Sequence, residues 1–253
     1  MPWLVLAAFL SLAPKSGAEE SPSGTNAFIA WAERLYGEAA ERWRRDTNSA
    51  ELCWQLGRAC FDRAEFATND TQRATLADQG IAVCRRAVQL DSNSAPAFYY
   101  LGLNTGQLAR TKLLAALFLV RQLEEALLTS SSLDPNFDFA GAHRSLGVLY
   151  RDAPGWPTSV GSRQKARRYL QRAVELAPDF PANRITLLES WLQWGEKKSV
   201  LQQIDPVEAV LKAARTNLTG AAWAPSWVEW DQRWQAVKVR IQVESTKSPK
   251  DSE

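Results

Sequence analysis

Two fixed intervals recur along the chain, and they constrain its fold more than any other feature of the sequence. At an interval of 45 residues a Leu-Gly pair returns three times, and Cys53, Phe98 and His143 are related in the same way. A second interval, of 43 residues, relates four rows of small or apolar residues. The pairs are Leu56-Gly57, Leu101-Gly102 and Leu146-Gly147, and the rows are Gly80, Leu123 and Ala166; Cys84, Leu127 and Leu170; Ala87, Ser130 and Ala173; and Leu90, Leu133 and Leu176. Because the four rows follow one another after 4, 3 and 3 residues, they lie on one face of a helix.

Each repeating unit is therefore predicted to be a hairpin of two helices. The first helix carries the Leu-Gly pair at its centre, where a residue without a side chain lets the second helix approach closely. The second helix ends at Leu90-Asp91-Ser92, Leu133-Asp134-Pro135 or Leu176-Ala177-Pro178, and proline cannot continue a helix. We predict an all-α solenoid of stacked hairpins over residues 19–244, with repeats at about 50–92, 95–135, 140–178 and, more weakly, 181–216.

The hairpins resemble tetratricopeptide repeats in their Leu-Gly pair, second-helix Ala and closing Pro. Tetratricopeptide units are about 34 residues long, so intervals of 43 to 45 residues leave roughly ten extra residues between the two helices of a unit. The sequence predicts long loops within the repeats at Thr68–Thr75 and Asp152–Pro157, and an extended helix at Leu108–Leu119.

Helices are also predicted at both ends of the solenoid, where they cover its exposed apolar faces. Before the first repeat, apolar residues at helical spacing predict a covering helix over about residues 26–45. At the other end Ser226 and Glu229 form a capping box, and the spacing of Trp227, Trp230 and Trp234 predicts a capping helix over residues 226–243 with these rings in the core. Residues 245–253 are polar and predicted to be disordered.

The first 18 residues are predicted to be a cleavable export signal peptide. Trp3–Ala13 is apolar but too short to span a bilayer, and Ser16-Gly17-Ala18 resembles a cleavage site. The alternative is a buried N-terminal helix, which Pro14 disfavours. Cleavage predicts a periplasmic or otherwise exported protein with no transmembrane segment after processing.

Three cysteines follow the proposed cleavage site, at Cys53, Cys60 and Cys84. All three occupy positions that repeat at the two intervals, so the first interpretation is that they are buried thiols. Export, together with the facing rows of Cys60 and Cys84, also allows the hypothesis of a disulfide between these two residues.

The composition disfavours several classes of function. The chain has 30 basic and 28 acidic residues, and this balance does not indicate nucleic-acid binding. A single His and three Cys leave few residues for a metal centre or for a base and nucleophile pair. We therefore expect no cofactor, no metal site and no catalytic residue, and His143 is expected to fill a buried structural position.

Further residues carry a resemblance to a known family. The stretches Leu133–Asp138, Ala142–Tyr150 and Ala153-Pro154-Gly155-Trp156-Pro157, followed by Lys165-Ala166, resemble the T-component proteins of tripartite ATP-independent periplasmic (TRAP) transporters. Gly57–Cys60 and Tyr100–Leu103 are similar to the related regulator of microtubule dynamics repeats. The resemblance implies a periplasmic helical scaffold that pairs with the transporter's solute-binding protein, forms trimers and performs no chemistry.

Candidate binding residues lie on the face of the first helices opposite the hairpin contact, because that face lines the concave side of a solenoid. An aromatic and arginine-lined groove is expected there, of a composition typical of protein hot spots. Its predicted members are Trp54, Arg58, Phe61, Tyr99, Arg144 and Arg151. The alternative is that these residues are solvated surface and inter-repeat packing. Trp156 has no periodic partner and is expected to be exposed or to insert into a neighbouring subunit.

The favoured function is a non-enzymatic, exported scaffold that docks a solute-binding protein and passes an apolar or acidic ligand along its groove. A general platform for envelope assembly, with the same fold but another partner, is the alternative. A hydrolase is disfavoured because the sequence offers no plausible base.

Overall fold

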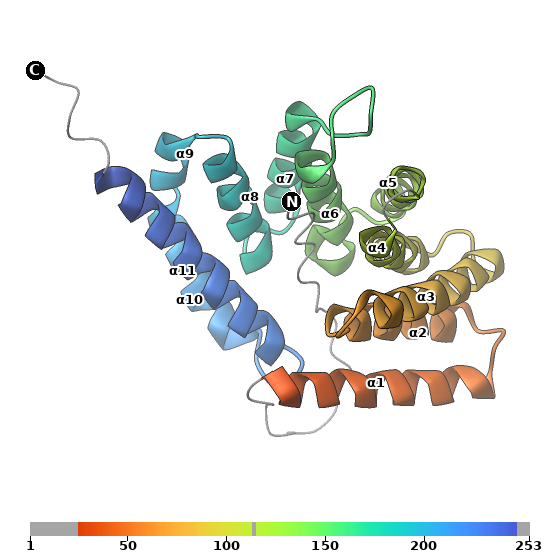
Figure 1. The fold of residues 1–253 in the computed structure, drawn as a ribbon. Helices are drawn as coiled ribbons and strands as arrows, with labels where there is room; N and C mark the ends of the chain where they lie inside the picture. Colours follow the sequence, from red (N-terminus) through yellow and green to blue (C-terminus); the bar gives the residue numbers. More distant parts are fainter. Residues whose placement is uncertain (1–24, 113–114, 247–253) are drawn as a thin grey trace, which may run out of the picture.

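The computed structural model describes residues 25–112 and 115–246, and these form helices joined by turns and loops (Figure 1). The predicted export segment, residues 1–18, lies outside the described residues, as do residues 247–253 of the predicted tail. The helices are α1 Thr25–Arg45, α2 Ala50–Glu65, α3 Asp70–Leu90, α4 Ala95–Thr111, α5 Ala116–Leu133, α6 Phe137–Asp152, α7 Arg163–Leu176, α8 Pro181–Gln193, α9 Lys197–Leu201, α10 Ile204–Asn217 and α11 Ala224–Thr246.

Consecutive helices pack as hairpins, α2 with α3, α4 with α5, and α6 with α7, and α8 packs against both α9 and α10. The first helices of successive hairpins also contact one another, so that α2, α4, α6 and α8 form a row. Helix α1 packs on α2 at one end of this row, and α11 packs on α8 at the other (Figure 1). The prediction of an all-α stack of helical hairpins is confirmed. No helix among the described residues is long and apolar enough to cross a bilayer.

Side-chain caps set the starts of several helices. Ser49, Asn69, Ser94 and Ser162 each precede a helix, and each side-chain oxygen accepts a hydrogen bond from the backbone N–H three residues later. Such bonds satisfy amides that have no partner within the helix. These short polar residues therefore set where the helices of the hairpins begin.

In each hairpin, the glycine of the Leu-Gly pair on the first helix contacts a residue from one of the 43-residue rows on the second helix. A Cβ atom on Gly57 would lie 2.1 Å from Cys84 Sγ, and one on Gly147 would lie 2.5 Å from Leu170 Cδ2. At Gly102 the corresponding distance to Leu127 is 3.0 Å. Cys84, Leu127 and Leu170 belong to one row of the 43-residue interval. Each glycine therefore makes room for the residue that occupies this row position in the second helix of its own hairpin.

The hypothesis of a Cys60–Cys84 disulfide is wrong, because all three cysteines are free and buried. The Cys84 sulfur occupies the space left by the missing side chain of Gly57. Cys60 packs with a different group of apolar residues, including Leu56 and Val83.

The prediction that long loops hold the extra residues of the repeats is wrong for the first hairpin. Its connection is only residues 66–69, and Thr71–Thr75 lie inside α3, where Asn69 caps the helix. A long loop occurs in the third hairpin, over residues 153–162. The extra length of the first unit therefore lengthens a helix.

The C-terminal helix differs in detail from its prediction. Helix α11 begins at Ala224, before the expected capping residue Ser226, and Glu229 pairs with Arg233 at 3.0 Å. Trp230 and Trp234 are buried as predicted, and they join a core formed by α8, α10 and α11. The end of the row is thus covered by aromatic packing.

Candidate functional site

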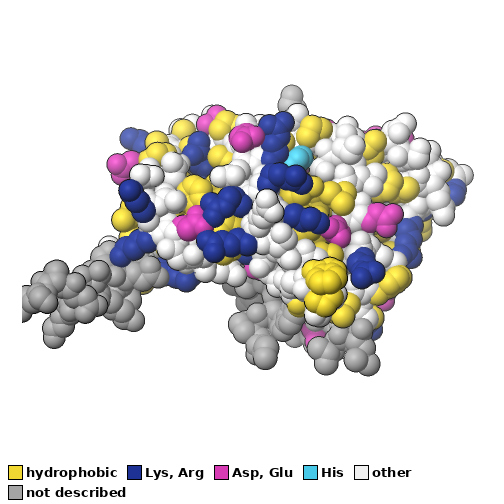
Figure 2. All heavy atoms as spheres, turned by 90° about the horizontal axis from the view of Figure 1, so that it is seen from above, with side chains coloured by type: hydrophobic (Ala, Val, Ile, Leu, Met, Phe, Trp, Pro, Cys, Tyr) yellow, Lys and Arg dark blue, Asp and Glu magenta, His cyan; other side chains and the backbone are white. Residues whose placement is uncertain are grey.

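The loop between α6 and α7 presents the most exposed large apolar side chain in the described part of the chain. Trp156 is 88% exposed. The loop stands at the top of Figure 1, on the face that Figure 2 views from above, where hydrophobic side chains lie among Lys and Arg. The prediction that Trp156 is exposed agrees with this position.

Backbone hydrogen bonds close this loop at its base. The Gly161 amide donates to the Pro154 carbonyl at 2.9 Å, and the Ser162 amide donates to the Tyr150 carbonyl at 2.8 Å. A Cβ atom on Gly161 would lie 2.0 Å from the Ala153 carbonyl oxygen, so only glycine fits there. Trp156 is therefore held out into solvent by an ordered backbone, and the entropy cost of fixing it on a partner is partly met before binding.

A second feature lies at the start of α6, where three consecutive residues adopt the left-handed conformation. Asp138, Phe139 and Ala140 have φ of 53°, 53° and 60°. This conformation costs a non-glycine residue roughly 1–2 kcal/mol, so the surroundings must impose it. The Tyr99 hydroxyl donates to Asp138 Oδ2 at 2.6 Å, and the Phe139 carbonyl accepts from Arg144 at 3.2 Å and from Asn183 at 3.0 Å.

Arg144 is the centre of this network. Its guanidinium donates to Asn183 Oδ1 at 2.7 Å and to Asp138 Oδ2 at 3.2 Å, and it lies over the Phe180 ring at 5.1 Å. Burial raises the pKa of Asp138 above its usual range, although Arg144 opposes this effect. The network joins α4, α6 and α8, which are the first helices of three successive hairpins.

Two further carboxyl groups lie on α2, where Asp62 is buried and Glu65 is partly buried. Asp62 contacts Arg58 at 3.5 Å, and Glu65 accepts from Gln107 and faces Arg110 at 3.6 Å. Burial raises the pKa of both carboxyl groups to about 7, against the opposing charges of Arg58 and Arg110. Both groups therefore titrate near neutrality.

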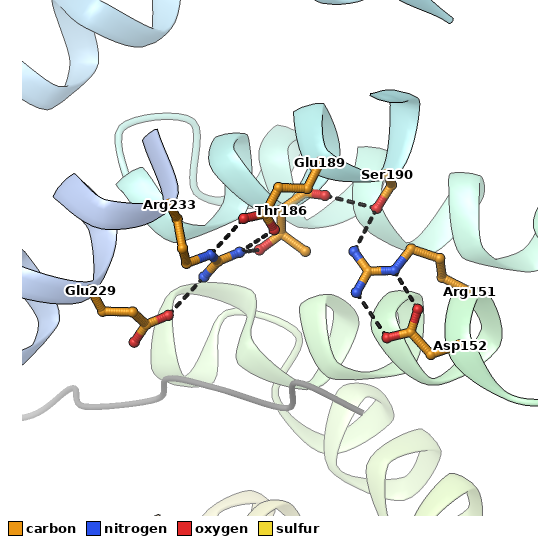
Figure 3. Close-up of polar contacts among 7 residues, drawn as sticks. All are labelled: Arg151, Asp152, Thr186, Glu189, Ser190, Glu229 and Arg233. Carbon is orange, nitrogen blue, oxygen red and sulfur yellow. Dashed lines mark hydrogen bonds and ion pairs between the residues drawn. The ribbon is translucent and has the colours of Figure 1, made fainter. Parts of the chain in front are cut away.

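Two arginines connect α8 to its neighbours (Figure 3). Arg151 of α6 pairs with Asp152 and donates to Ser190 at 3.0 Å. Arg233 of α11 pairs with Glu189 at 2.6 Å and donates to Thr186. Burial disfavours the charged form of Arg233, but Glu189 and Glu229 outweigh burial and raise its pKa. These charges fix α8 between α6 and α11.

The predicted groove residues do not form one open surface. Phe61, Tyr99 and Arg144 are at most 1% exposed, so the expectation that they line an open groove is wrong. Contacts between successive first helices close this face. Arg58 and Arg151 are partly buried in ion pairs, and Trp54 is partly buried and stacks on Tyr100 with ring centroids 6.0 Å apart. Whether any of these residues contacts a partner stays a prediction.

His143 takes the buried position that the sequence predicts. Four residues of the polar networks are not among the candidates from the sequence: Asp62, Asp138, Asn183 and Arg233. His143 is buried beside Tyr169, with ring centroids 5.8 Å apart. The four-residue spacing from Arg58 to Asp62 and from Glu229 to Arg233 indicates two of the ion pairs. Nothing in the sequence indicates the roles of Asp138 and Asn183. No group of three or more His, Cys, Asp or Glu side chains in the described ranges could hold a metal ion.

Comparison with known proteins supports the fold. A family model described as Regulator of microtubule dynamics protein 1-3 matches residues 30–127, which include the similar stretches Gly57–Cys60 and Tyr100–Leu103. The crystal structure of TTC0263, a thermophilic TPR protein in Thermus thermophilus, is 16% identical with a TM-score of 0.58, covering 85% of this chain and 98% of that one. The crystal structure of MamA is 17% identical with a TM-score of 0.51, covering 73% and 91%.

No curated protein matches the chain. At these identities the two crystal structures show a shared fold, and this chain is a tetratricopeptide-like stack of helical hairpins. The resemblance to regulator of microtubule dynamics repeats is confirmed over residues 30–127. These matches do not bear on the T-component resemblance, which stays a prediction.

Proposed function

We propose that the protein is a non-enzymatic interaction scaffold, exported from the cytoplasm, which docks the solute-binding protein of a TRAP-type transporter. The observation that carries the proposal is Trp156, an 88% exposed indole on a hydrogen-bonded loop. Tryptophan is among the residues that contribute most to protein interfaces. The Pro-Gly-Trp-Pro sequence of this loop is also the most specific part of the T-component resemblance.

Hydrogen bonds to the neighbouring helices hold this loop in place. The Tyr150 carbonyl at the end of α6 accepts from the Ser162 amide, and the Tyr150 hydroxyl donates to Glu124 of α5 at 2.6 Å. The loop is thereby tied to two hairpins. A partner seated on Trp156 would contact a surface whose backbone is fixed before binding, which favours protein recognition over a chemical step.

The test is site-specific cross-linking in the native cells. A photoactivatable phenylalanine analogue is placed at position 156, and captured proteins are identified by mass spectrometry. The matched control places the same analogue at Val239, which is 55% exposed on α11. Capture of a solute-binding protein from position 156 and not from position 239 supports the proposal. Capture of envelope assembly factors alone contradicts the transport role.

A further inference from the structure

Helix α7 follows the Trp156 loop directly and has the most one-sided charge of the described helices. Its fourteen residues include five basic side chains, Arg163, Lys165, Arg167, Arg168 and Arg172, against the single acidic residue Glu175. The chain as a whole is nearly balanced, with 30 basic and 28 acidic residues. Figure 2 shows Lys and Arg side chains gathered on the face seen from above. We call the outward side of α7 together with Trp156 the α7 face.

At the start of α7, two guanidinium groups share one carboxylate. Arg163 and Arg167 both donate to Glu196, and both lie against the Trp194 ring, 5.3 and 5.2 Å from its centroid. Hydrogen bonds from Arg167 and then Arg163 lower the pKa of Glu196, although burial opposes them. One negative charge cannot neutralise two positive ones. The cluster therefore keeps an excess positive charge in a fixed geometry.

Farther along the helix, cations are held over rings or in loose pairs. Lys165 is half exposed, lies 4.7 Å from the Tyr150 ring centroid, and is 3.7 Å from Glu124. Arg168 lies over the Tyr169 ring at 5.3 Å, and Arg172 pairs with Glu175 across one helical turn. Burial and then the charge of Arg172 lower the pKa of His143 beneath this surface. Surface pairs of this kind are weak and leave the cations available to another carboxylate.

We propose that the α7 face binds an acidic segment of a partner protein, with an apolar residue against Trp156 and carboxylates along Lys165, Arg168 and Arg172. The inference rests on the proposed function as a protein-binding scaffold and names the chemistry of its partner. Charge complementarity is the reason. Lys165, Arg168 and Arg172 follow one another after three and four residues, so they lie on one side of α7. This row of cations, on the helix that follows the exposed Trp156, matches a segment that combines carboxylates with an apolar anchor.

The test measures fluorescence anisotropy of labelled twelve-residue peptides with the full chain. One peptide alternates Glu with small polar residues around a central Leu-Leu, and its partner has Gln at every Glu position. We expect the Glu peptide to bind about tenfold more tightly at low salt, and added salt to remove this preference. Arg168→Glu with Arg172→Glu should abolish the preference.

The matched control is Arg85→Glu with Lys212→Glu, which makes the same change of charge at exposed positions on α3 and α10. Circular dichroism establishes that both double variants are folded. Equal affinity for the two peptides overturns the inference, as does equal loss in the test and control variants. Binding to phosphatidylserine vesicles without any peptide preference also overturns it, in favour of a membrane surface.

The two proposals can fail separately. If position 156 captures a solute-binding protein but the peptides show no preference for Glu, the scaffold role stands and the acidic partner is wrong. If the Glu peptide binds the α7 face but no solute-binding protein is captured, the transport role is wrong and the inference stands.

Discussion

Gly57 occupies a position where even a methyl group would overlap a neighbouring atom. A Cβ there would lie 2.1 Å from Cys84 Sγ. Because α2 and α3 would have to separate, we expect Gly57→Ala to lower the free energy of unfolding by about 2 kcal/mol or more, measured by urea denaturation. Adding Cys84→Ala should recover part of the loss, since it removes the overlapping sulfur.

Gly37 in α1 provides the control, because nothing lies within 4 Å of a Cβ placed there. Alanine is a better helix former than glycine, so Gly37→Ala should raise the free energy of unfolding by about 0.5–1 kcal/mol. If both substitutions had the same sign, the close approach at Gly57 would not be the cause.

Asp62 should make stability depend on pH. The carboxyl has a usual pKa of 3.8, which burial raises to about 7 in the folded chain. Between these values the folded state binds more protons than the unfolded state, so the free energy of unfolding falls as pH rises from about 4 to 7. The corresponding upper limit is about 4 kcal/mol.

Asp62→Asn removes this titration. Relative to the parent, the variant should gain stability as pH rises from about 4 to 7 and show no further gain above. Urea denaturation across this range measures the difference. Parallel curves for the two proteins would show that Asp62 titrates normally. Glu65, whose pKa is also raised to about 7, should give the parent and the variant the same remaining pH dependence.

At the level of elements, Arg144 determines how α4, α6 and α8 fit together. Arg144→Met would leave the buried Asp138 carboxylate without its cation, and we expect a loss of about 3–5 kcal/mol in the free energy of unfolding. Adding Asp138→Asn should reduce that loss, because no unpaired charge then remains. Arg172→Met, at an exposed position of α7, should change stability by no more than about 0.5 kcal/mol. Chemical denaturation measures all three variants.

The helices are the part of the fold that the sequence predicts best. Leu56-Gly57 and its repeats at 45 residues mark helices that pack with the 43-residue rows, because side chains facing a neighbouring helix must return every three or four residues. The left-handed turn at Asp138–Ala140 could not be predicted in this way. It depends on Tyr99 and Asn183, which are distant in sequence and are brought together by packing.

At the level of the whole molecule, we expect Trp156 to contribute to binding a partner and not to the stability of the fold. The side chain is 88% exposed, so Trp156→Ala should alter the free energy of unfolding by no more than about 0.5 kcal/mol. The same change should weaken binding of the Glu peptide to the α7 face, measured by fluorescence anisotropy. An unchanged affinity in the variant would count against this role.

Only part of the candidate site could be predicted. Trp156 is recognisable because it breaks the periodicity and lies between prolines in a loop. Tyr99 and Arg144 are predicted on an open face because a solenoid is expected to leave its first helices uncovered. In the structure they are buried, and contacts between α4, α6 and α8 are a tertiary property that no local pattern encodes.

The rates at which the three buried thiols of the first hairpin react with a labelling reagent would measure how often this hairpin opens. Burial raises the pKa of Cys60 to about 12, and only a thiolate reacts readily with a labelling reagent. Modification therefore requires the helices to separate first. Cys53 packs against Ala97 of α4, and Cys84 fills the space at Gly57, so mass spectrometry of each site over time would report different openings. Equal rates would mean that the first two hairpins open as one unit, and faster labelling at one site would locate the weaker junction.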